Sequence, residues 1–230
     1  MLEGRIVKKR GHFTIDISFT CENGKLLALT GSSGAGKTTV IRALAGLNKP
    51  DRGQIVYDKK VWFDGAKIWV PARDRRIGYV FQEHTLFPHL NVEKNVGFSC
   101  KNKTRITELL EMLGIRHLAL KKPHQISGGE RQRAAFAQAL ASDPQVLLLD
   151  EPFSALDAVT RVRLRQELKR LKSQLDIPIV FVTHDLEEAS YLADKIVELP
   201  CPRTQTQNLK KCGLVSSDYG GNMQVVHSIP

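Results

Sequence analysis

The stretch that decides the fold runs from Gly31 to Thr39 and reads GSSGAGKTT. It follows an apolar run, Leu26–Thr30, that is typical of a buried strand, and it precedes a helical pattern over Thr38–Leu47. A G-x-x-x-x-G-K-[ST] motif between a strand and a helix predicts a loop that wraps a polyphosphate. Glycines let the backbone approach the phosphates closely, and successive N–H groups at the helix N-terminus attract their negative charge.

Each residue of this loop has an expected part in binding. Lys37 can reach the β- and γ-phosphates as a point charge, and Thr38 can offer its hydroxyl to Mg²⁺, which prefers hard oxygen ligands. The alternative is a glycine-rich surface turn with an exposed lysine, which does not require a strand and a helix on either side. The residues expected to bind the nucleotide are Gly31, Ser32, Ser33, Gly34, Ala35, Gly36, Lys37, Thr38 and Thr39.

Length and composition set the broad class. The chain has 230 residues and a formal net charge of +10, which suits one domain with a subdomain. A basic balance suits nucleic acid, acidic head-groups or phosphate ligands without choosing among them, and the scattered positive charges are typical of a solvated surface. Its four cysteines are far apart and form no C-x-x-C pair, which argues against a zinc site. No run is long and apolar enough to span a bilayer, so we expect a cytoplasmic protein.

Strand and helix patterns alternate along the chain, which predicts an α/β fold with a parallel sheet covered on both faces. The expected strands are 5–9, 13–19, 25–30, 54–58, 60–64, 76–82, 145–149, 177–183 and 195–199. The expected helices are 38–47, 92–99, 104–113, about 116–120, 128–141, 157–175 and 186–193. We expect one domain over residues 1–199, with a helical subdomain over about 84–142 and a short polar tail at 200–230.

Polar residues follow three of the apolar strands. Asp150 and Glu151 end the run Val146–Leu149, and ligands gather at the carboxyl ends of parallel strands. We expect Asp150 to face Mg²⁺ and Glu151 to polarise the attacking water as a general base. Gln82 can touch Mg²⁺ or that water, and His184 can contact the γ-phosphate. The alternatives are solvated strand ends and a structural histidine.

A second anion site is expected at the start of the helix 128–141. Ser127 is a good N-cap, and Glu130 completes a capping box three residues later. Capping does not explain the adjacent Gly128 and Gly129. Their bare backbone N–H groups predict that this helix tip also binds an anion.

These segments together resemble the ATP-binding cassette (ABC) ATPases. Six motifs carry the resemblance in the family's order: Walker A at Gly31–Thr39, the Q-loop at Gln82, the signature at Ser127–Gln132, Walker B at Val146–Glu151, the D-loop at Ser154–Asp157 and the switch histidine at His184. The signature is preceded by Ile126, where leucine is usual. The resemblance covers about residues 1–199.

The resemblance implies a P-loop NTPase (RecA-like) core with an N-terminal antiparallel β subdomain and a helical insertion that carries the signature. It implies an ATPase that uses ATP and Mg²⁺. It also implies a head-to-tail homodimer, in which Ser127 and Gly129 of one copy bind the γ-phosphate held by the other. Relatives stack an aromatic residue on adenine, and Phe13 is the aromatic nearest to that place.

Within the family, the stretch Arg75–Val96 resembles ATPase subunits of importers that use a separate binding protein. The molybdate/tungstate type is nearest, and sulfate, polyamine, iron and sugar importers are alternatives. The resemblance implies a transmembrane permease that docks at a groove near Glu83–Leu90, a solute-binding protein that acts indirectly, and a place at the cytoplasmic face of the membrane. Core packing is the alternative for Leu86 and Leu90.

Two other classes stay open. One is a soluble ABC ATPase that acts on nucleic acid or ribosomes. Such proteins usually join two cassettes in one chain or insert a long coiled coil, and this sequence shows neither, so we expect no nucleic-acid partner. The other class is a nucleotide-binding module without turnover. Molybdate-type subunits also commonly carry a C-terminal anion-binding regulatory domain. The chain ends too soon after residue 199 for such a domain, so we expect none.

Overall fold

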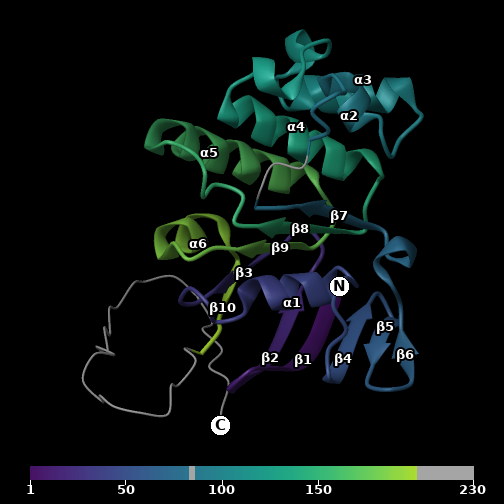
Figure 1. Cartoon of the computed structure of the whole chain (residues 1–230), viewed down its shortest axis with the longest axis vertical. Coiled ribbons are helices and arrows are strands. Elements are labelled where there is room, and N and C mark those ends of the chain that lie inside the picture. Colours follow the sequence, from purple (N-terminus) through teal and green to yellow (C-terminus); the bar gives the residue numbers. More distant parts are fainter. Residues whose placement is uncertain (83–85, 201–230) are drawn as a thin grey trace.

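Two five-stranded sheets and six helices build the computed structural model of the chain, which describes residues 1–82 and 86–200 (Figure 1). One sheet is antiparallel, with strand order β2-β1-β4-β5-β6. The other is parallel, with strand order β10-β3-β9-β8-β7. Of the predicted tail at 200–230, residues 201–230 lie outside the described residues. Within them, no helix is both long and apolar enough to cross a bilayer.

The elements have the following bounds. The antiparallel sheet contains β1 (Leu2–Arg10), β2 (Phe13–Cys21), β4 (Arg52–Tyr57), β5 (Lys60–Asp64) and β6 (Ile68–Trp69). The parallel sheet contains β3 (Leu26–Thr30), β7 (Ile77–Val80), β8 (Val146–Asp150), β9 (Ile179–Val182) and β10 (Lys195–Glu198). The helices are α1 (Lys37–Leu44), α2 (Val92–Val96), α3 (Lys103–Met112), α4 (Gly128–Ala141), α5 (Ala158–Gln174) and α6 (Leu186–Leu192). Single 3₁₀ turns lie at Ala72–Asp74, Arg116–Leu118 and Pro123–Gln125.

The parallel sheet is buried on both faces, as the continuous apolar runs predict. Successive side chains of a strand point to opposite faces. In β3, Leu26 and Ala28 therefore pack into the core shared with α4 and α5. Leu27 and Leu29 pack into the core shared with α1 and the antiparallel sheet. In Figure 1, α1 accordingly lies between the two sheets, and the helices α2–α4 gather on the far side of the parallel sheet.

Several predicted boundaries are wrong by a few residues, and two of these differences have a local cause. The first helix ends at Leu44 and not at Leu47, because Gly46 takes a left-handed φ of 73° that stops it. The predicted helix 157–175 begins one residue later, because Asp157 is its N-cap and accepts from the Thr160 N–H at 3.0 Å. The segment 92–99 is helical only to Val96, and 116–120 forms a single 3₁₀ turn.

Arg75 joins the antiparallel subdomain to α1. Its guanidinium donates to the carbonyl oxygens of Ala43 and Leu44, at 2.9 and 2.7 Å, at the C-terminal end of that helix. It also lies over the rings of Trp62 and Trp69, 5.2 and 4.9 Å from their centroids. Burial lowers the pKa of Arg75 to about 10. The junction is therefore held by one buried cation with backbone and aromatic partners.

Replacing Arg75 with methionine should lower the free energy of unfolding by about 2 to 4 kcal/mol, because buried carbonyl oxygens would lose their donors. Chemical denaturation of the full chain measures this change. Arg73→Met is the matched control, since the Arg73 side chain is 85% exposed, and it should leave the stability within about 0.5 kcal/mol. Equal stability of the two variants would contradict the structural role of Arg75.

Candidate functional site

The glycine loop connects β3 to α1 and is shaped by close backbone contacts. Gly36, the N-cap of α1, has a left-handed φ of 97°. A Cβ at this position would lie only 2.3 Å from Cδ1 of Ile15 on β2. A glycine is therefore required here both for the turn and for the approach of β2.

Lys37 is folded into this loop. Its side chain is only 5% exposed, and its ammonium group donates to the carbonyl oxygens of Gly31 and Ser32 at 2.8 and 3.0 Å. Within residues 1–82 and 86–200, no carboxylate pairs with it. A buried cation held only by carbonyl groups leaves a positive charge to be balanced. That charge is suited to a phosphate ligand.

Asp150 brings oxygen ligands beside the loop. It is buried at the end of β8, where its Oδ1 accepts from the Thr38 hydroxyl at 3.4 Å and its Oδ2 accepts from the Tyr79 hydroxyl at 3.1 Å. Burial raises the pKa of Asp150. Burial, together with the negative charge of Asp150, raises the pKa of Tyr79. A carboxylate beside a hydroxyl at a phosphate loop is a donor set that fits Mg²⁺.

Sequence analysis missed Tyr79, although it lies in a predicted strand. Tyr79 reaches Asp150 because β7 pairs with β8 in parallel, with Tyr79 opposite Leu148. The chain separates these two strands by the whole helical insertion. Only the strand pairing could have identified this contact.

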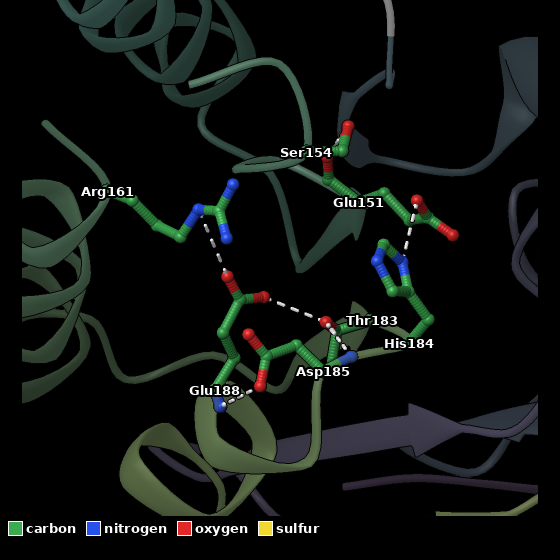
Figure 2. A pocket seen from close by; sticks show the side chains of 7 residues that line it. All are labelled: Glu151, Ser154, Arg161, Thr183, His184, Asp185 and Glu188. Atoms are coloured by element: carbon green, nitrogen blue, oxygen red, sulfur yellow. Dashed lines mark hydrogen bonds and ion pairs between the residues drawn. The ribbon is translucent and has the colours of Figure 1, made fainter. Parts of the chain in front are cut away.

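Glu151 and His184 meet at the same edge of the sheet (Figure 2). They follow the neighbouring strands β8 and β9, in which Asp150 lies opposite Val182. The Nδ1 atom of His184 lies 3.2 Å from Oε2 of Glu151. Glu151 has a left-handed φ of 45°, a conformation that costs a non-glycine residue about 1–3 kcal/mol. The surrounding contacts therefore hold Glu151 in a strained orientation.

Gln82 follows β7 and is exposed. Since β7 is the neighbour of β8, Gln82 lies at the same edge of the sheet as Asp150. Its role stays a prediction. The next three residues, 83–85, lie outside the described residues.

The end of the first hairpin also reaches the loop. Phe13 begins β2, and its Cε2 lies 4.0 Å from the position that a Cβ on Gly36 would take. Opposite Phe13 in the hairpin, Arg10 donates to the Thr39 hydroxyl at 2.9 Å. Sequence analysis did not assign Arg10 a role, although the hairpin register predicts that it lies near Phe13. Both side chains are thus placed beside the predicted phosphate loop.

The helix tip at Ser127 has the predicted capping box. The carboxylate of Glu130 accepts from the Ser127 N–H at 2.7 Å, and the Glu130 N–H donates to the Ser127 hydroxyl at 3.3 Å. The Ser127 hydrogen bonds also lower the pKa of Glu130. Among the described residues, no hydrogen bond joins Ser127, Gly128 or Gly129 to the glycine loop of the same chain.

The structure corrects one argument about this tip. A Cβ on Gly129 would lie 2.6 Å from Cγ2 of Thr160 on α5, so packing alone requires a glycine there. A Cβ on Gly128 would lie 3.4 Å from Leu156, which is an ordinary contact. The prediction that an anion site is needed to explain both glycines is therefore wrong for Gly129.

A groove of about 560 Å³ opens between β7 and the helical subdomain. Its lining residues are Arg73, Arg75, Arg76, Ile77, Gly78, Tyr79, Phe81, Phe87, Phe98, Ser99, Gln138, Ala139 and Ser142. Of the predicted docking segment Glu83–Leu90, residues 83–85 lie outside the described residues. Phe87 lines the groove, but Leu86 is only 7% exposed and packs in the core, so the groove assignment is wrong for Leu86. The buried Asn95 fixes this segment by accepting from the Phe87 N–H at 2.7 Å.

Comparison with known proteins identifies the family to which the chain belongs. Residues 15–154 match the model of the ABC transporter family. The chain belongs to the ABC transporter family. The sequence is 44% identical, over 205 residues, to the Fe(3+) ions import ATP-binding protein FbpC 2 of Haemophilus influenzae, a match that covers 82% of this chain and 57% of that protein. It is also 44% identical, over 192 residues, to the molybdenum import ATP-binding protein ModC of Methylococcus capsulatus, covering 81% and 54%.

A solved structure supports the fold. It is the dimeric structure of a post-hydrolysis state of an ATP-binding cassette bound to ADP and Pi. It matches with a TM-score of 0.69 and 30% identity over 86% of this ABC chain and 94% of that one. The predicted P-loop NTPase architecture, with its antiparallel subdomain and helical insertion, is confirmed. The chain spans about half the length of the two curated relatives described above.

The contact between α4 and α5 yields a test of packing. Gly129→Ala should lower the free energy of unfolding by about 1 to 2 kcal/mol, because the new methyl group overpacks against Thr160. Gly128→Ala should be neutral or slightly stabilising, since the site has room and alanine favours a helix. Thermal and chemical denaturation of the two variants measure the difference.

A second substitution identifies the cause. Thr160→Ser removes the methyl group that a Cβ on Gly129 would meet, so it should restore most of the stability lost in Gly129→Ala. If Gly129→Ala is as stable as Gly128→Ala, or if Thr160→Ser restores nothing, close packing is not the reason for Gly129.

Proposed function

We propose that this chain is the ATP-hydrolysing subunit of an ABC importer, with its nucleotide-binding domain over residues 1–199. The observation that best supports this proposal lies at one edge of the parallel sheet. Four side chains meet there: Thr38, Asp150, Glu151 and His184. Such an edge, beside a glycine-rich loop, is where α/β proteins of this kind act on phosphate ligands. We assign the nucleotide to the loop Gly31–Thr39, with Phe13 beside it.

The roles of the catalytic residues follow from their contacts. Lys37 and the backbone N–H groups of the loop hold the β- and γ-phosphates. Thr38 and Asp150 would hold Mg²⁺, with Gln82 at the same edge, and the ion supplies positive charge against the phosphate oxygens. Glu151 accepts a proton from the attacking water, whose oxygen forms the new bond to the γ-phosphorus as the bond to the ADP oxygen breaks.

His184 orients Glu151 through the 3.2 Å contact of its Nδ1 atom. Its Nε2 atom is left to contact the γ-phosphate. Phosphoryl transfer depends mainly on positioning and on charge stabilisation, so a small displacement of either residue slows the reaction.

We extend the proposal to a homodimer. The support is the 30% identical ATP-binding cassette structure, which is dimeric and bound to ADP and Pi. Ser127 is exposed at the tip of α4 and, with the backbone of Gly128 and Gly129, would bind the γ-phosphate held by the second copy. Two copies would then enclose two nucleotides.

The groove supports docking of a permease. Phe98 is 67% exposed at its rim, and its ring lies 4.4 Å from that of Phe87, measured between centroids. Exposed aromatic side chains in a groove are typical of a protein interface. We propose that a transmembrane permease docks here and holds the chain at the cytoplasmic face of the membrane, while an extracytoplasmic solute-binding protein acts through the permease. No nucleic acid is required.

The proposed solute is an oxyanion, with molybdate or tungstate first. The molybdenum relative and the stretch Arg75–Val96 support this choice. The iron relative is equally similar in sequence, at 44% identity. Iron uptake is therefore the second candidate.

Glu151→Gln tests the catalytic proposal. The amide cannot accept the proton of the attacking water, so the rate of ATP hydrolysis should fall by at least about 100-fold. ATP binding, measured with a fluorescent analogue, should stay within about threefold of wild type, because the loop Gly31–Thr39 is unchanged. Size-exclusion chromatography with ATP should then show a trapped dimer.

Lys37→Ala is the comparison, because it should weaken ATP binding itself and give no ATP-dependent dimer. A Glu151→Gln protein that hydrolyses ATP at the wild-type rate would remove Glu151 from its role as base. If the wild-type chain binds ATP without hydrolysing it, the proposed ATPase activity is wrong and the chain is a nucleotide-binding module.

Phe98→Asp tests the permease and the solute together. A cell strain without this gene should recover uptake of labelled molybdate with the wild-type chain and not with Phe98→Asp, because a charge in the groove opposes docking. The purified variant should still hydrolyse ATP. Leu120→Asp, a change at another exposed apolar residue outside the groove lining, should restore uptake. Recovery of iron uptake alone would contradict the oxyanion assignment.

A further inference from the structure

A cavity of about 40 Å³ lies beside Glu151 and His184, whose side chains Figure 2 shows with the rest of its lining. Its lining residues are Glu151, Ser154, Arg161, Thr183, His184, Asp185 and Glu188. Glu188, on α6, is only 5% exposed, and burial raises its pKa. Carboxylates are rarely buried without partners. The reaction proposed above gives Glu188 no part, so its burial needs another explanation.

Glu188 fixes the backbone on both sides of His184. Its Oε2 accepts from the Thr183 hydroxyl at 2.8 Å, and the same hydroxyl oxygen accepts from the Asp185 N–H at 3.0 Å. The Asp185 carboxylate in turn accepts from the Glu187 and Glu188 N–H groups at 2.8 and 3.2 Å. These hydrogen bonds form a closed network of Thr183, Asp185 and Glu188. Because His184 lies between Thr183 and Asp185 in the chain, its position depends on the Glu188 carboxylate.

Arg161, on α5, links this cluster to the segment 154–157. Its Nε lies 4.0 Å from Oε1 of Glu188 and has no hydrogen-bond partner within the described part of the chain. Its Nη2 donates to the Leu156 carbonyl oxygen at 3.0 Å. At the other end of the segment, the Ser154 hydroxyl donates to the Glu151 carbonyl oxygen at 3.0 Å. One guanidinium group therefore faces both the His184 side and the segment that follows Glu151.

These contacts form a ring around the cavity. Figure 2 shows Arg161 on α5 turned toward Glu188 on α6, and His184 turned toward Glu151. The ring runs through Glu151, Ser154, Leu156, Arg161, Glu188, Thr183 and His184 and returns to Glu151. Ser154 and Asp157 are exposed. A second copy of the chain could therefore displace the segment 154–157 from outside.

We propose that Glu188 is a positioning residue that, with Arg161, couples the segment 154–157 to His184 and so holds the Glu151–His184 contact in its working geometry. Glu188 does not touch the substrate. It acts through Thr183 on one side and through Arg161 on the other. This inference rests on the ATP hydrolysis proposed above. The coupling between the segment 154–157 and His184 can be measured separately from hydrolysis.

Glu188→Gln is the first test, made in the full chain. The amide oxygen can still accept from Thr183, but the amide N–H groups would face the N–H of Arg161. The kcat for ATP should fall about tenfold, because the uncharged amide no longer attracts Arg161 across the 4.0 Å contact and leaves the guanidinium charge unpaired. The KM should stay within about twofold, because no loop residue has changed. Glu187→Gln, at the exposed neighbouring carboxylate, should behave as wild type.

Arg161→Met tests whether the two residues act as one unit. It should lower kcat by a similar factor, and the double variant should be no slower than either single variant, because both changes break the same link. Arg161→Lys keeps the charge and should recover part of kcat. Fully additive losses, an unchanged kcat in Glu188→Gln, or a loss that appears only in KM would each overturn the proposal.

Amide hydrogen exchange of the same proteins measures the coupling without catalysis. Glu188→Gln should speed exchange in 154–161 as well as in 183–189, and Arg161→Met should do the same. Wild-type exchange at 154–161 in a folded Glu188→Gln protein overturns the coupling. If Glu188→Gln does not fold, Arg161→Met tests the coupling instead. Faster exchange at 183–189 in that variant supports the coupling, and wild-type exchange there overturns it. A wild-type chain without ATPase activity would refute the proposed function, whereas the exchange result would still decide the coupling.

Discussion

Parallel pairing of β7, β8 and β9 is the constraint on which the site depends. All residues of β8 and β9 are buried, and this burial sets their register because a one-residue shift would exchange the two faces of each strand. The register places Asp150 opposite Val182 and Tyr79 opposite Leu148. The side chains that follow these strands then meet at one edge, although they come from distant parts of the chain.

In the described part of the chain, three buried charges have no ion-pair partner, and two of them lie at this edge. Lys37 is held by carbonyl oxygens, Asp150 by two hydroxyl groups, and Arg75 by carbonyl oxygens and aromatic rings. Hydrogen bonds of this kind make burial tolerable without neutralising the charge. At this edge, Lys37 and Asp150 are therefore left to pair with a ligand, whereas Arg75 lies at the other end of β7 and joins the antiparallel sheet to α1.

The strand β7 connects the site to the groove. Tyr79 donates to Asp150 and also lines the groove, and Phe81 lies two residues further along the same segment. The ring centroids of Tyr79 and Phe81 are 4.2 Å apart. A molecule bound in the groove would thus be separated from the Asp150 carboxylate by a single side chain. This short path is a physical route by which the proposed docking in the groove would affect the proposed nucleotide site.

The sequence by itself determined the glycine loop between a strand and a helix, the order of the strands and helices apart from β6, and the capping of α4. Each of these depends on residues that are close in the chain. Only the tertiary structure decided the contacts of Tyr79 with Asp150, Arg10 with Thr39 and Glu188 with Arg161. It also showed that Gly129 is required by Thr160 and that Leu86 belongs to the core. The physical reason is that sheet register and helix packing bring together residues whose separation along the chain carries no periodic signal.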